Sequence, residues 1–245
     1  MQGSKGVAFV TGAAGGMGQA VCKALVQRGN RVVLADRNAD GVNKLAAELG
    51  PATHPFALDV TDPVAVDSCV GRLPAAFSPI DVLVNNAGHD IGGRKRFDLG
   101  SPDDWSSIIE TNLIGLMRVT RAIMPGMVER NRGDIVNMGS VIALRIVLDT
   151  VPYSTSKAGV HMLSDIIRAE LAETPIRVTE IMPGLTKTNA IVARYRGDEE
   201  EAKRYYDSFK MALDPQDVAR CIVFALDQPP EVQISQLVVL PINRY

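Results

Sequence analysis

The stretch GVAFVTGAAGGMGQA, residues 6–20, joins an apolar run of strand length to a helix-like run through a glycine-rich turn. Gly12, Gly16 and Gly18 lie in that turn. Glycine at such positions permits a tight turn, lets the backbone approach a pyrophosphate, and lets the helix pack closely on the strand. The helix N-terminus adds unpaired N–H groups and a positive dipole end. The stretch therefore predicts a strand–turn–helix unit that binds a dinucleotide.

An acidic residue after the next apolar run supports this site. Asp36 ends RVVLAD, 18 residues beyond Gly18. A carboxylate there accepts hydrogen bonds from the hydroxyls of the adenosine ribose and repels a 2′-phosphate. Arg37 beside it either receives such a phosphate or faces solvent. We therefore predict NAD as the cofactor, with NADP as the alternative.

Apolar runs of strand length alternate with amphipathic runs along the rest of the chain. The predicted strands are 6–10, 31–35, 80–84, 134–138, 177–181 and 236–240. The predicted helices are 17–28, 40–49, 63–76, 103–130, 154–173 and 215–227. This alternation implies right-handed crossovers and a parallel sheet with helices on both faces. We predict an α/β fold, a single Rossmann-type doubly wound parallel sheet of about seven strands, as one domain over residues 1–245.

The segment between PGLT (183–186) and the helix that begins near Pro215 contains no predicted strand. Within it, RYRGDEEEAKR (194–204) has eight charged residues in eleven, so we expect that it does not pack against the sheet. Insertions of this length in a compact domain are commonly lids or binding loops. We predict a substrate lid at about 186–212 that closes over the site; a solvated connecting helix is the alternative.

The composition excludes several kinds of partner. The net charge is −2, which argues against nucleic acid as a partner. No apolar run approaches the roughly 18 residues that a membrane span needs, and the chain enters its first strand without a signal-peptide pattern. The three cysteines suit reduced thiols, and the three histidines have no metal-ligand spacing. We expect a cytoplasmic protein without a metal site.

More motifs follow in a fixed order. They are Asp59-Val60, NNAG (85–88), Asn112 in ETNLIG, Ser140 in NMGS, YSTSK (153–157) and PGLTKT (183–188). Together with TGAAGGMG, this ordered set resembles the short-chain dehydrogenase/reductase family over essentially the whole chain. The resemblance implies these cofactor contacts: Gly12, Gly16, Met17, Gly18, Asp36, Arg37, Asp59, Val60, Asn86, Ala87, Gly88, Tyr153, Lys157, Pro183, Gly184, Thr186 and Thr188.

Tyr153 and Lys157 lie four residues apart and therefore share one helix face. A nearby ammonium lowers the pKa of a phenol, and a general acid/base works best with a pKa near ambient pH. The resemblance implies that Tyr153 is the acid/base and that Lys157 also binds the nicotinamide ribose. It further implies that Ser140 holds the substrate oxygen and that Asn112 helps position a water that relays the proton. Taken singly, Tyr153 could equally be a core aromatic, Ser140 a cap and Asn112 a structural amide.

Segments near these motifs predict the substrate site. Its candidate residues are His89, which is followed by Asp90, and Arg94, Ile142, Arg145, Arg194 and Tyr195. Arginine binds two oxygens of a carboxylate or phosphate at once. RAIMPGMVERNRGDIVNMGS resembles the subgroup that acts on serine and other 3-hydroxy acids, which usually uses NADP, and Asp36 departs from that subgroup. We predict reversible NAD-dependent oxidation of a small polar secondary alcohol, with an anionic 3-hydroxy acid as a candidate.

Two other functions remain open from the sequence. A polyol or a bulkier apolar alcohol would use Ile142, Ile146, Val147 and Leu148 as pocket walls, and a non-catalytic NAD-sensing regulator would use the same fold. Family members are commonly tetramers that pair through helices corresponding to 103–130 and 154–173. We therefore expect a homotetramer, or a homodimer.

Overall fold

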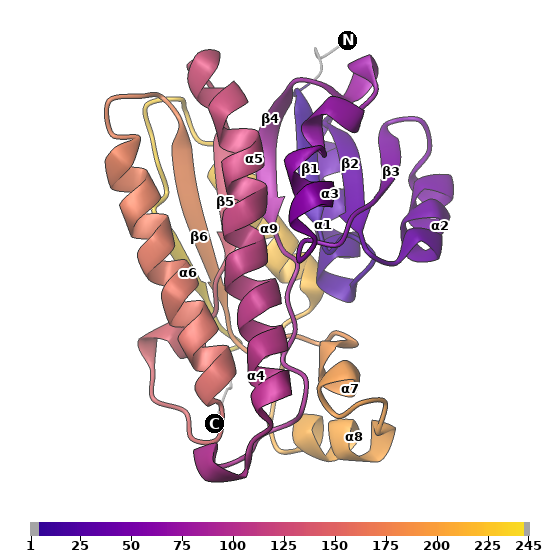
Figure 1. The fold of residues 1–245 in the computed structure, drawn as a ribbon, viewed down its shortest axis with the longest axis vertical. Coiled ribbons are helices and arrows are strands. Elements are labelled where there is room, and N and C mark those ends of the chain that lie inside the picture. Colours follow the sequence, from indigo (N-terminus) through magenta and orange to yellow (C-terminus); the bar gives the residue numbers. More distant parts are fainter. Residues whose placement is uncertain (1–4, 243–245) are drawn as a thin grey trace.

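The computed structural model describes residues 5–242, and its centre is one parallel sheet (Figure 1). Seven strands run in the order β3-β2-β1-β4-β5-β6-β7, and every neighbouring pair is parallel. The strands are β1 (Val7–Thr11), β2 (Arg31–Asp36), β3 (Thr53–Ala57), β4 (Ile80–Asn85), β5 (Asp134–Met138), β6 (Arg177–Pro183) and β7 (Gln236–Val239). This topology confirms the predicted doubly wound α/β fold.

Helices cover both faces of the sheet, with α5 and α6 in front of it and α1 and α9 behind it in Figure 1. One buried apolar cluster joins the sheet to α1 (Gly16–Arg28), α2 (Ala39–Leu49) and α9 (Pro215–Leu226). A second joins the opposite face to α3 (Pro63–Asp67), α5 (Leu116–Glu129) and α6 (Val151–Glu170). Because both faces are covered, the central strands are largely buried, and every residue of β1 is buried.

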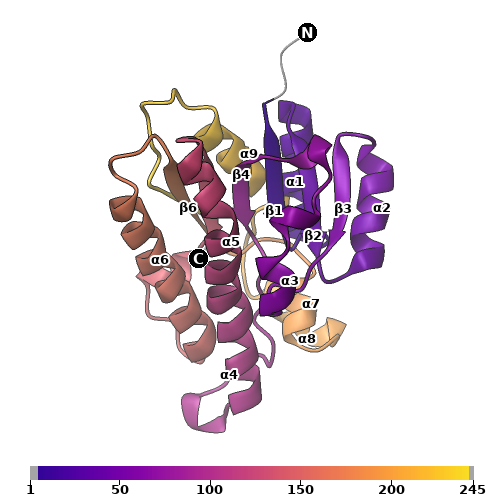
Figure 2. The same ribbon diagram turned by 45° about the horizontal axis from the view of Figure 1, so that its top comes forward.

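The carboxyl ends of the strands meet at the lower edge of the sheet in Figure 1. There β1 and β4 lie side by side, and the strand order runs outward from them in both directions. Ligands of doubly wound sheets bind in the crevice at this switch point. The same end carries α4 (Pro102–Ile109), α7 (Ala190–Arg194) and α8 (Glu199–Asp207), as Figures 1 and 2 show.

One strand of the structure was not among the predicted runs, and one predicted helix is shorter than expected. The strand Thr53–Ala57 was not among the predicted runs because THPFA has no continuous apolar run; it is an edge strand with only two buried residues. The helix predicted over 63–76 ends at Asp67, where the Ser68 hydroxyl bonds to carbonyl groups of the preceding turn. Two short 3-10 turns, Val70–Arg72 and Ala75–Phe77, replace its remainder.

The long helix predicted over 103–130 is interrupted by a change of winding. A π-helical turn, Glu110–Gly115, lies between α4 and α5. Such turns inside α-helices occur often at functional sites, because the extra residue per turn re-aims a side chain. The turn carries Asn112, one of the predicted site residues.

The predicted lid region forms two short helices, α7 and α8, beyond the end of β6 (Figure 1). Residues 199–201 of α8 are acidic and in the first turn, where they suit the helix dipole. Arg194 departs from our expectation for the charged run 194–204, because it is only 9% exposed. No helix within residues 5–242 is long and apolar enough to cross a membrane.

Candidate active site

The glycine turn between β1 and α1 forms a cradle of bare backbone. Gly12 has a φ of +66°, and a Cβ on Gly18 would lie 2.1 Å from the Gly12 carbonyl oxygen. Gly15 caps α1 without a side-chain hydrogen bond, and the first turn of α1 contains no acidic residue. The positive end of α1 therefore has no side-chain acceptor, which suits the phosphates of a nucleotide.

Asp36 lies at the end of β2, against the glycine turn. Its Oδ2 accepts a hydrogen bond from the Ala14 N–H at 3.0 Å, and its Oδ1 accepts one from the Asn38 N–H at 2.9 Å. The neighbouring Arg37 is exposed. Burial alone would raise the pKa of Asp59, but hydrogen bonds within its own loop and the charge of Arg37 hold it below its usual value. The acidic and basic candidates for the adenosine end thus lie close together.

Asn86 joins the segment after β4 to the glycine turn. Its Nδ2 donates to the carbonyl oxygens of Thr11 at 2.9 Å and Gly12 at 3.0 Å. In return, the Thr11 hydroxyl accepts from the N–H groups of Asn86 and Ala87, each at 3.0 Å. The Asn86 amide therefore holds the cradle in shape. Thr11 was not among the predicted site residues, although it stands directly before the first glycine of the motif.

Asn112 makes a two-way contact with the backbone of His89. Its Oδ1 accepts from the His89 N–H at 2.8 Å, and its Nδ2 donates to the His89 carbonyl at 2.9 Å and to Ser156 Oγ at 3.1 Å. A Cβ on Gly88 would lie 3.0 Å from Asn112 Oδ1. Both amide protons thus tie the loop after β4 to α6. The water relay implied by the resemblance stays a prediction.

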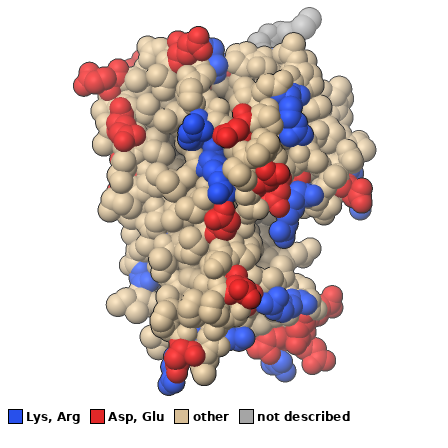
Figure 3. Space-filling model, viewed as in Figure 1, with Lys and Arg blue, Asp and Glu red and all other residues tan. Residues whose placement is uncertain are grey.

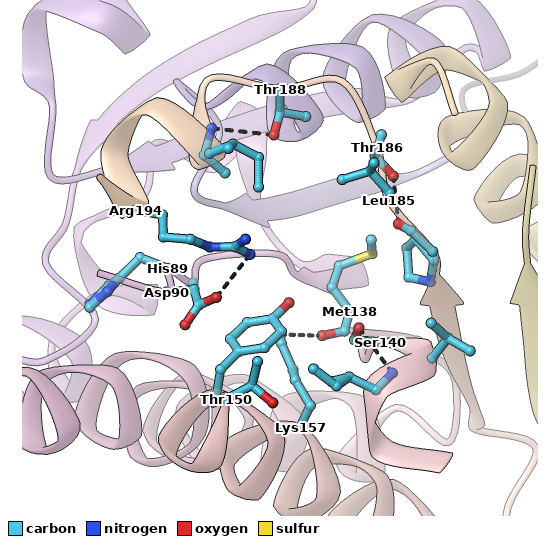
Figure 4. A pocket seen from close by; sticks show the side chains of 18 of the residues that line it. His89, Asp90, Met138, Ser140, Thr150, Lys157, Leu185, Thr186, Thr188 and Arg194 are labelled. Atoms are coloured by element: carbon cyan, nitrogen blue, oxygen red, sulfur yellow. Dashed lines mark hydrogen bonds and ion pairs between the residues drawn. The ribbon is translucent and has the colours of Figure 1, made fainter. Parts of the chain in front are cut away.

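A cavity of about 340 Å³ lies beside these segments (Figure 4). The predicted site residues that line it are Met17, Asn86, Gly88, His89, Arg94, Ser140, Ile142, Arg145, Tyr153, Lys157, Pro183, Gly184, Thr186, Thr188 and Arg194. The predicted residues outside its lining are Gly12, Gly16, Gly18, Asp36, Arg37, Asp59, Val60, Ala87, Asn112 and Tyr195. Tyr195 packs against Gly93 and Tyr205, and Tyr205 and Phe209 supply the aromatic part of the wall.

Tyr153 and Ser140 line the same cavity, and their side chains interact. Burial raises the pKa of Tyr153 to about 12, and the charge of Asp90 acts in the same direction. The hydrogen bond with Ser140 and the charge of Arg194 lower it. The pKa is therefore raised, whereas we predicted a tyrosine pKa lowered by the neighbouring lysine. Burial outweighs the lowering effect of Arg194 in this structure, and the expected effect of Lys157 stays a prediction.

Lys157 is buried one helical turn from Tyr153. Its Nζ lies 5.7 Å from the centroid of the Tyr153 ring and donates a hydrogen bond to the Met138 carbonyl at 2.7 Å. Burial lowers the pKa of Lys157 to about 8, although the charges of Glu180 and Asp90 raise it. The Lys157 ammonium is thus hydrogen-bonded to the end of β5. The negative charges of Glu180 and Asp90 favour its protonated form. Asp90 follows the predicted site residue His89, whereas Glu180 was not predicted from the sequence.

Arg194 reaches from α7 to Asp90 at the cavity wall (Figure 4). Its Nη2 lies 2.9 Å from Asp90 Oδ2, and both side chains are nearly buried. The Nε and Nη1 atoms of Arg194 are buried without a hydrogen-bond partner. Burial raises the pKa of Asp90 to about 6, against the lowering effect of Arg194 and Arg94. The Arg194 guanidinium, with two nitrogens that lack hydrogen-bond partners, therefore lines the same cavity as Tyr153.

Tyr205 of α8 lies between two arginines. The Arg194 Cζ is 4.7 Å and the Arg94 Cζ is 5.0 Å from the centroid of its ring. Arg94 Nη2 also donates to the Tyr205 hydroxyl at 2.9 Å. Cation–π contacts of this kind attach α8 to the loop after β4 and to α7. This contact could not be predicted from the sequence, since a strongly charged helical segment does not indicate which of its aromatic side chains faces inward.

His89 lines the cavity from the same loop. Its Nε2 lies 3.2 Å from Thr111 Oγ1 and 3.3 Å from Ser107 Oγ. Burial and the charge of Arg37 lower the pKa of His89. Among residues 5–242, no group of three or more His, Cys, Asp or Glu side chains is arranged to hold a metal ion.

Comparison with known proteins places this geometry in a family. The family model described as short chain dehydrogenase matches residues 6–199. The NADP-dependent 3-hydroxy acid dehydrogenase of Shigella flexneri is 36% identical over 239 residues, which cover 97% of this chain and 96% of that protein. The serine 3-dehydrogenase of Agrobacterium fabrum is 33% identical over 98% of this chain and 95% of its own.

A solved structure agrees with these relatives. The closed form of a serine dehydrogenase complexed with NADP+ superposes with a TM-score of 0.94 at 35% identity, covering 98% of this chain and 96% of that one. The sheet order, the glycine turn and the Tyr153–Lys157 helix thus belong to a chain that is similar to these dehydrogenases over nearly its whole length. The protein is therefore a member of the short chain dehydrogenase family, oxidoreductases that act on CH–OH groups with a nicotinamide cofactor.

Proposed function

We propose that the protein is an NAD-dependent dehydrogenase that reversibly oxidises a small polar secondary alcohol, with Tyr153 as the general acid/base. The observation that carries the proposal is the Tyr153 phenol, bonded to Ser140 and next to Lys157, in a cavity that shares Met17 with the glycine turn. Such a cavity holds an alcohol oxygen and a proton acceptor within one enclosed space.

The residues at the strand ends fit a dinucleotide. Glycine occupies positions 12, 15, 16 and 18 of the turn, and the N-terminus of α1 has no side-chain cap. A bound nicotinamide would accept the hydride in oxidation and supply it in reduction. Asp36 would accept hydrogen bonds from the adenosine ribose and disfavour a 2′-phosphate. This favours NAD, although the Shigella flexneri relative is named as NADP-dependent, the solved serine dehydrogenase is complexed with NADP+, and Arg37 offers a phosphate partner.

The proton would move through this chain's own side chains. Tyr153 would take the proton of the alcohol during oxidation and return it during reduction, while Ser140 Oγ holds the alcohol oxygen. The phenolate needs positive charge nearby, because burial otherwise holds the pKa of Tyr153 near 12. Lys157 would supply that charge and bind the nicotinamide ribose, as the family resemblance implies.

The substrate proposal rests on Arg194. Two of its three guanidinium nitrogens are buried without a partner, at the wall of a cavity that also contains Arg94 and Arg145. A buried donor without an acceptor is costly, and a carboxylate would satisfy it with charge-assisted hydrogen bonds. We therefore propose an anionic 3-hydroxy acid as the substrate class, the chemistry that the names of the two relatives also carry.

A neutral polyol is the second candidate, and one observation favours it. Asp90 already neutralises part of the Arg194 charge, and its carboxylate would accept hydrogen bonds from substrate hydroxyl groups. Ile142 and Val147 give the same cavity an apolar side. The bulkier apolar alcohol that the sequence left open fits less well, because several charged side chains line the wall.

We also propose that residues 186–212 form the lid of this cavity. Tyr205 is held between Arg94 and Arg194, and the Tyr206 hydroxyl accepts from the Thr188 N–H at 3.0 Å and donates to its carbonyl at 2.8 Å. These contacts link α8 to both walls of the cavity. A substrate carboxylate on Arg194 would strengthen the closed arrangement.

A homotetramer, or a homodimer, remains our proposal for the assembly. Exposed apolar side chains occur on both long helices, including Met117 on α5 and Met162 and Ile166 on α6. In Figure 3 charged side chains are sparse over α6 and gather over α8. Light scattering after gel filtration would test this; a monomeric mass at micromolar concentration would contradict it.

The whole proposal is tested by initial rates with 3-hydroxy acids, polyols and aromatic alcohols, followed by NADH or NADPH absorbance. We expect turnover of at least one 3-hydroxy acid with NAD and a higher kcat/KM with NAD than with NADP. Equal efficiency with both cofactors would refute the cofactor assignment. A panel in which only neutral alcohols turn over would replace the 3-hydroxy acid with a polyol.

A further inference from the structure

A row of buried polar side chains crosses the sheet beneath α6. Asn85, Asn137 and Glu180 occupy neighbouring positions on β4, β5 and β6, and each is at most 2% exposed. Asn137 Oδ1 accepts from Asn85 Nδ2, and Asn137 Nδ2 donates to Ser164 Oγ, both at 2.9 Å. The ionisable member of the row is Glu180. A buried carboxylate in a sheet is costly unless its charge has a partner, so its surroundings need an explanation.

The two oxygens of Glu180 have different surroundings. Oε2 lies 2.7 Å from His161 Nδ1 on α6, which is hydrogen-bond distance. Oε1 is buried without a hydrogen-bond partner. A carboxylate that leaves one oxygen unbonded in the core gives up stabilisation that a second donor would supply. Hydrogen bonding alone therefore does not account for this residue.

The unbonded oxygen lies against the turn that carries the candidate catalytic serine. A Cβ on Gly139 would be 2.2 Å from Glu180 Oε1, so only glycine admits the carboxylate here. Gly139 stands between Met138, whose carbonyl accepts the Lys157 hydrogen bond at 2.7 Å, and Ser140, which bonds to Tyr153. Glu180 does not line the cavity. It therefore reaches the site from the side of the sheet, behind the turn.

Charge connects Glu180 to Lys157. The acidic groups that act on the buried ammonium of Lys157 are Glu180 from β6 and Asp90 from the loop after β4, and both favour its protonated form. The charged groups that act on Glu180 are His161, Asp165 and Lys157, all on α6. Asp90 is itself paired with Arg194, which weakens its field at the lysine. Glu180 is paired with His161 instead of with an arginine.

We propose that Glu180 is a positioning residue that acts through Lys157: its carboxylate, held by His161 and seated against Gly139, keeps the lysine as an ammonium ion beside Tyr153. The inference rests on the proposed role of Lys157. Gly139 is the structural complement of Glu180, because its missing side chain makes room for the charge. His161 fixes the carboxylate from the partly exposed side of α6.

The sign of the effect follows from the charges. Burial favours neutral Lys157, and the negative charge of Glu180 opposes burial. Removing that charge lowers the pKa of Lys157, so the ammonium is lost at a lower pH. The alkaline limb of kcat/KM for alcohol oxidation, where Lys157 loses its proton, then moves downward. A purely structural role for Glu180 would change stability and leave this limb in place.

Glu180→Gln is the principal variant, because the glutamine oxygen can still accept the His161 hydrogen bond. We expect its alkaline limb about 0.5 to 1 pH unit below that of the wild type, roughly a threefold to tenfold loss of proton affinity. Lys157 is also titrated directly, by the pH dependence of carbamylation with cyanate, mapped by peptide mass spectrometry. Only the neutral amine reacts, so Lys157 should react at lower pH in the variant.

Three further variants complete the test. Glu180→Asp keeps the charge and should titrate within about 0.3 pH unit of the wild type. Asp165→Asn removes a carboxylate from the same helix that does not act on Lys157, and should leave its titration unchanged. Gly139→Ala forces the carboxylate away from the turn and should shift Lys157 in the same direction as Glu180→Gln, which covers the case in which the glutamine variant does not fold.

A Lys157 titration that is the same in wild type, Glu180→Gln and Gly139→Ala would overturn the inference. The carbamylation measurement needs no substrate. If no alcohol in the panel turns over but the Lys157 titration shifts as expected, the inference stands and the proposed function fails. If turnover depends on Lys157 but the Lys157 titration is the same with and without the Glu180 charge, the proposed function stands and the inference about Glu180 fails.

Discussion

Lys157 Nζ lies 5.7 Å from the centroid of the Tyr153 ring, yet its hydrogen bond goes to the Met138 carbonyl rather than to the phenol. The ammonium is thus attached to the end of β5, and Tyr153 is bonded to Ser140 at the start of the next turn. Helix α6 brings Tyr153 and Lys157 together, but the end of β5 fixes the position of the Lys157 ammonium through the Met138 carbonyl.

Replacing Tyr153 by Phe removes the proposed proton acceptor and leaves the ring in place. We expect kcat for oxidation to fall about 10²-fold to 10⁴-fold, the usual contribution of a general acid/base. Binding of NADH, followed by fluorescence, should change little. Full turnover by Tyr153→Phe on the true substrate would show that another group handles the proton.

Asp90→Asn tests the charges around Tyr153. The negative charge of Asp90 raises the pKa of Tyr153, so its removal lowers that pKa. Oxidation needs the phenolate, and the acid limb of kcat/KM should move about 0.5 to 1 pH unit downward. The alkaline limb should move downward as well, because Asp90 also raises the pKa of Lys157. An acid limb that moves upward would contradict the assignment.

Asp36→Ala removes the carboxylate that we expect to select NAD. The ratio of kcat/KM for NAD to that for NADP should fall at least about tenfold, or 1.4 kcal/mol, chiefly through the KM of NAD. The Ala14 and Asn38 N–H groups lose their acceptor too, so a thermal unfolding scan should accompany the kinetics. A ratio that does not change would mean that Arg37, and not Asp36, sets the preference.

Arg194→Met tests the anionic substrate. We expect the KM of a 3-hydroxy acid to rise about 10-fold to 100-fold, the loss of a charge-assisted hydrogen bond of roughly 1.5–3 kcal/mol. Polyol kinetics should change less. Lys203→Met is the matched control, since Lys203 has the same charge on the neighbouring helix but is exposed. An equal effect of Arg194→Met on acids and polyols would remove the argument for a carboxylate.

Tyr205→Leu tests the attachment of the lid. The variant loses two cation–π contacts, each worth about 0.5–2 kcal/mol, and the hydrogen bond from Arg94. Limited proteolysis should then cut residues 194–210 faster, with mass spectrometry identifying the sites. Cleavage at the wild-type rate would mean that other contacts hold α8 in place.

The strands and the glycine turn could be predicted from the sequence because their signals are local. The run 134–138 matches β5 to the residue, since four of its five residues are buried and Ile135, Val136 and Met138 give the run an apolar character. β3 could not be found in this way, because an edge strand with partly exposed residues has no such segment. The helix predicted over 63–76 was too long for a related reason: the Ser68 hydroxyl competes for the backbone carbonyls and ends it.

In the candidate site, too, only the features that depend on neighbouring residues in the chain could be predicted. The four-residue spacing of Tyr153 and Lys157 was enough to place both on one face of α6, because helix geometry is local. Whether the pKa of Tyr153 is raised or lowered could not be predicted from this spacing. The shift depends on burial and on the charges of Asp90 and Arg194, which come from other segments.

The sequence by itself determined the order of the elements, the nucleotide cradle and the pair on α6, because each follows from residues close together in the chain. Only the tertiary structure decided that Arg194 meets Asp90, 104 residues earlier, and that Glu180 lies behind the Gly139 turn. Contacts between residues so far apart in the chain cannot be predicted from hydrophobic periodicity or motif spacing. They arise when the parallel sheet aligns the carboxyl ends of strands that are far apart in sequence, and the charges gathered there then set one another's protonation.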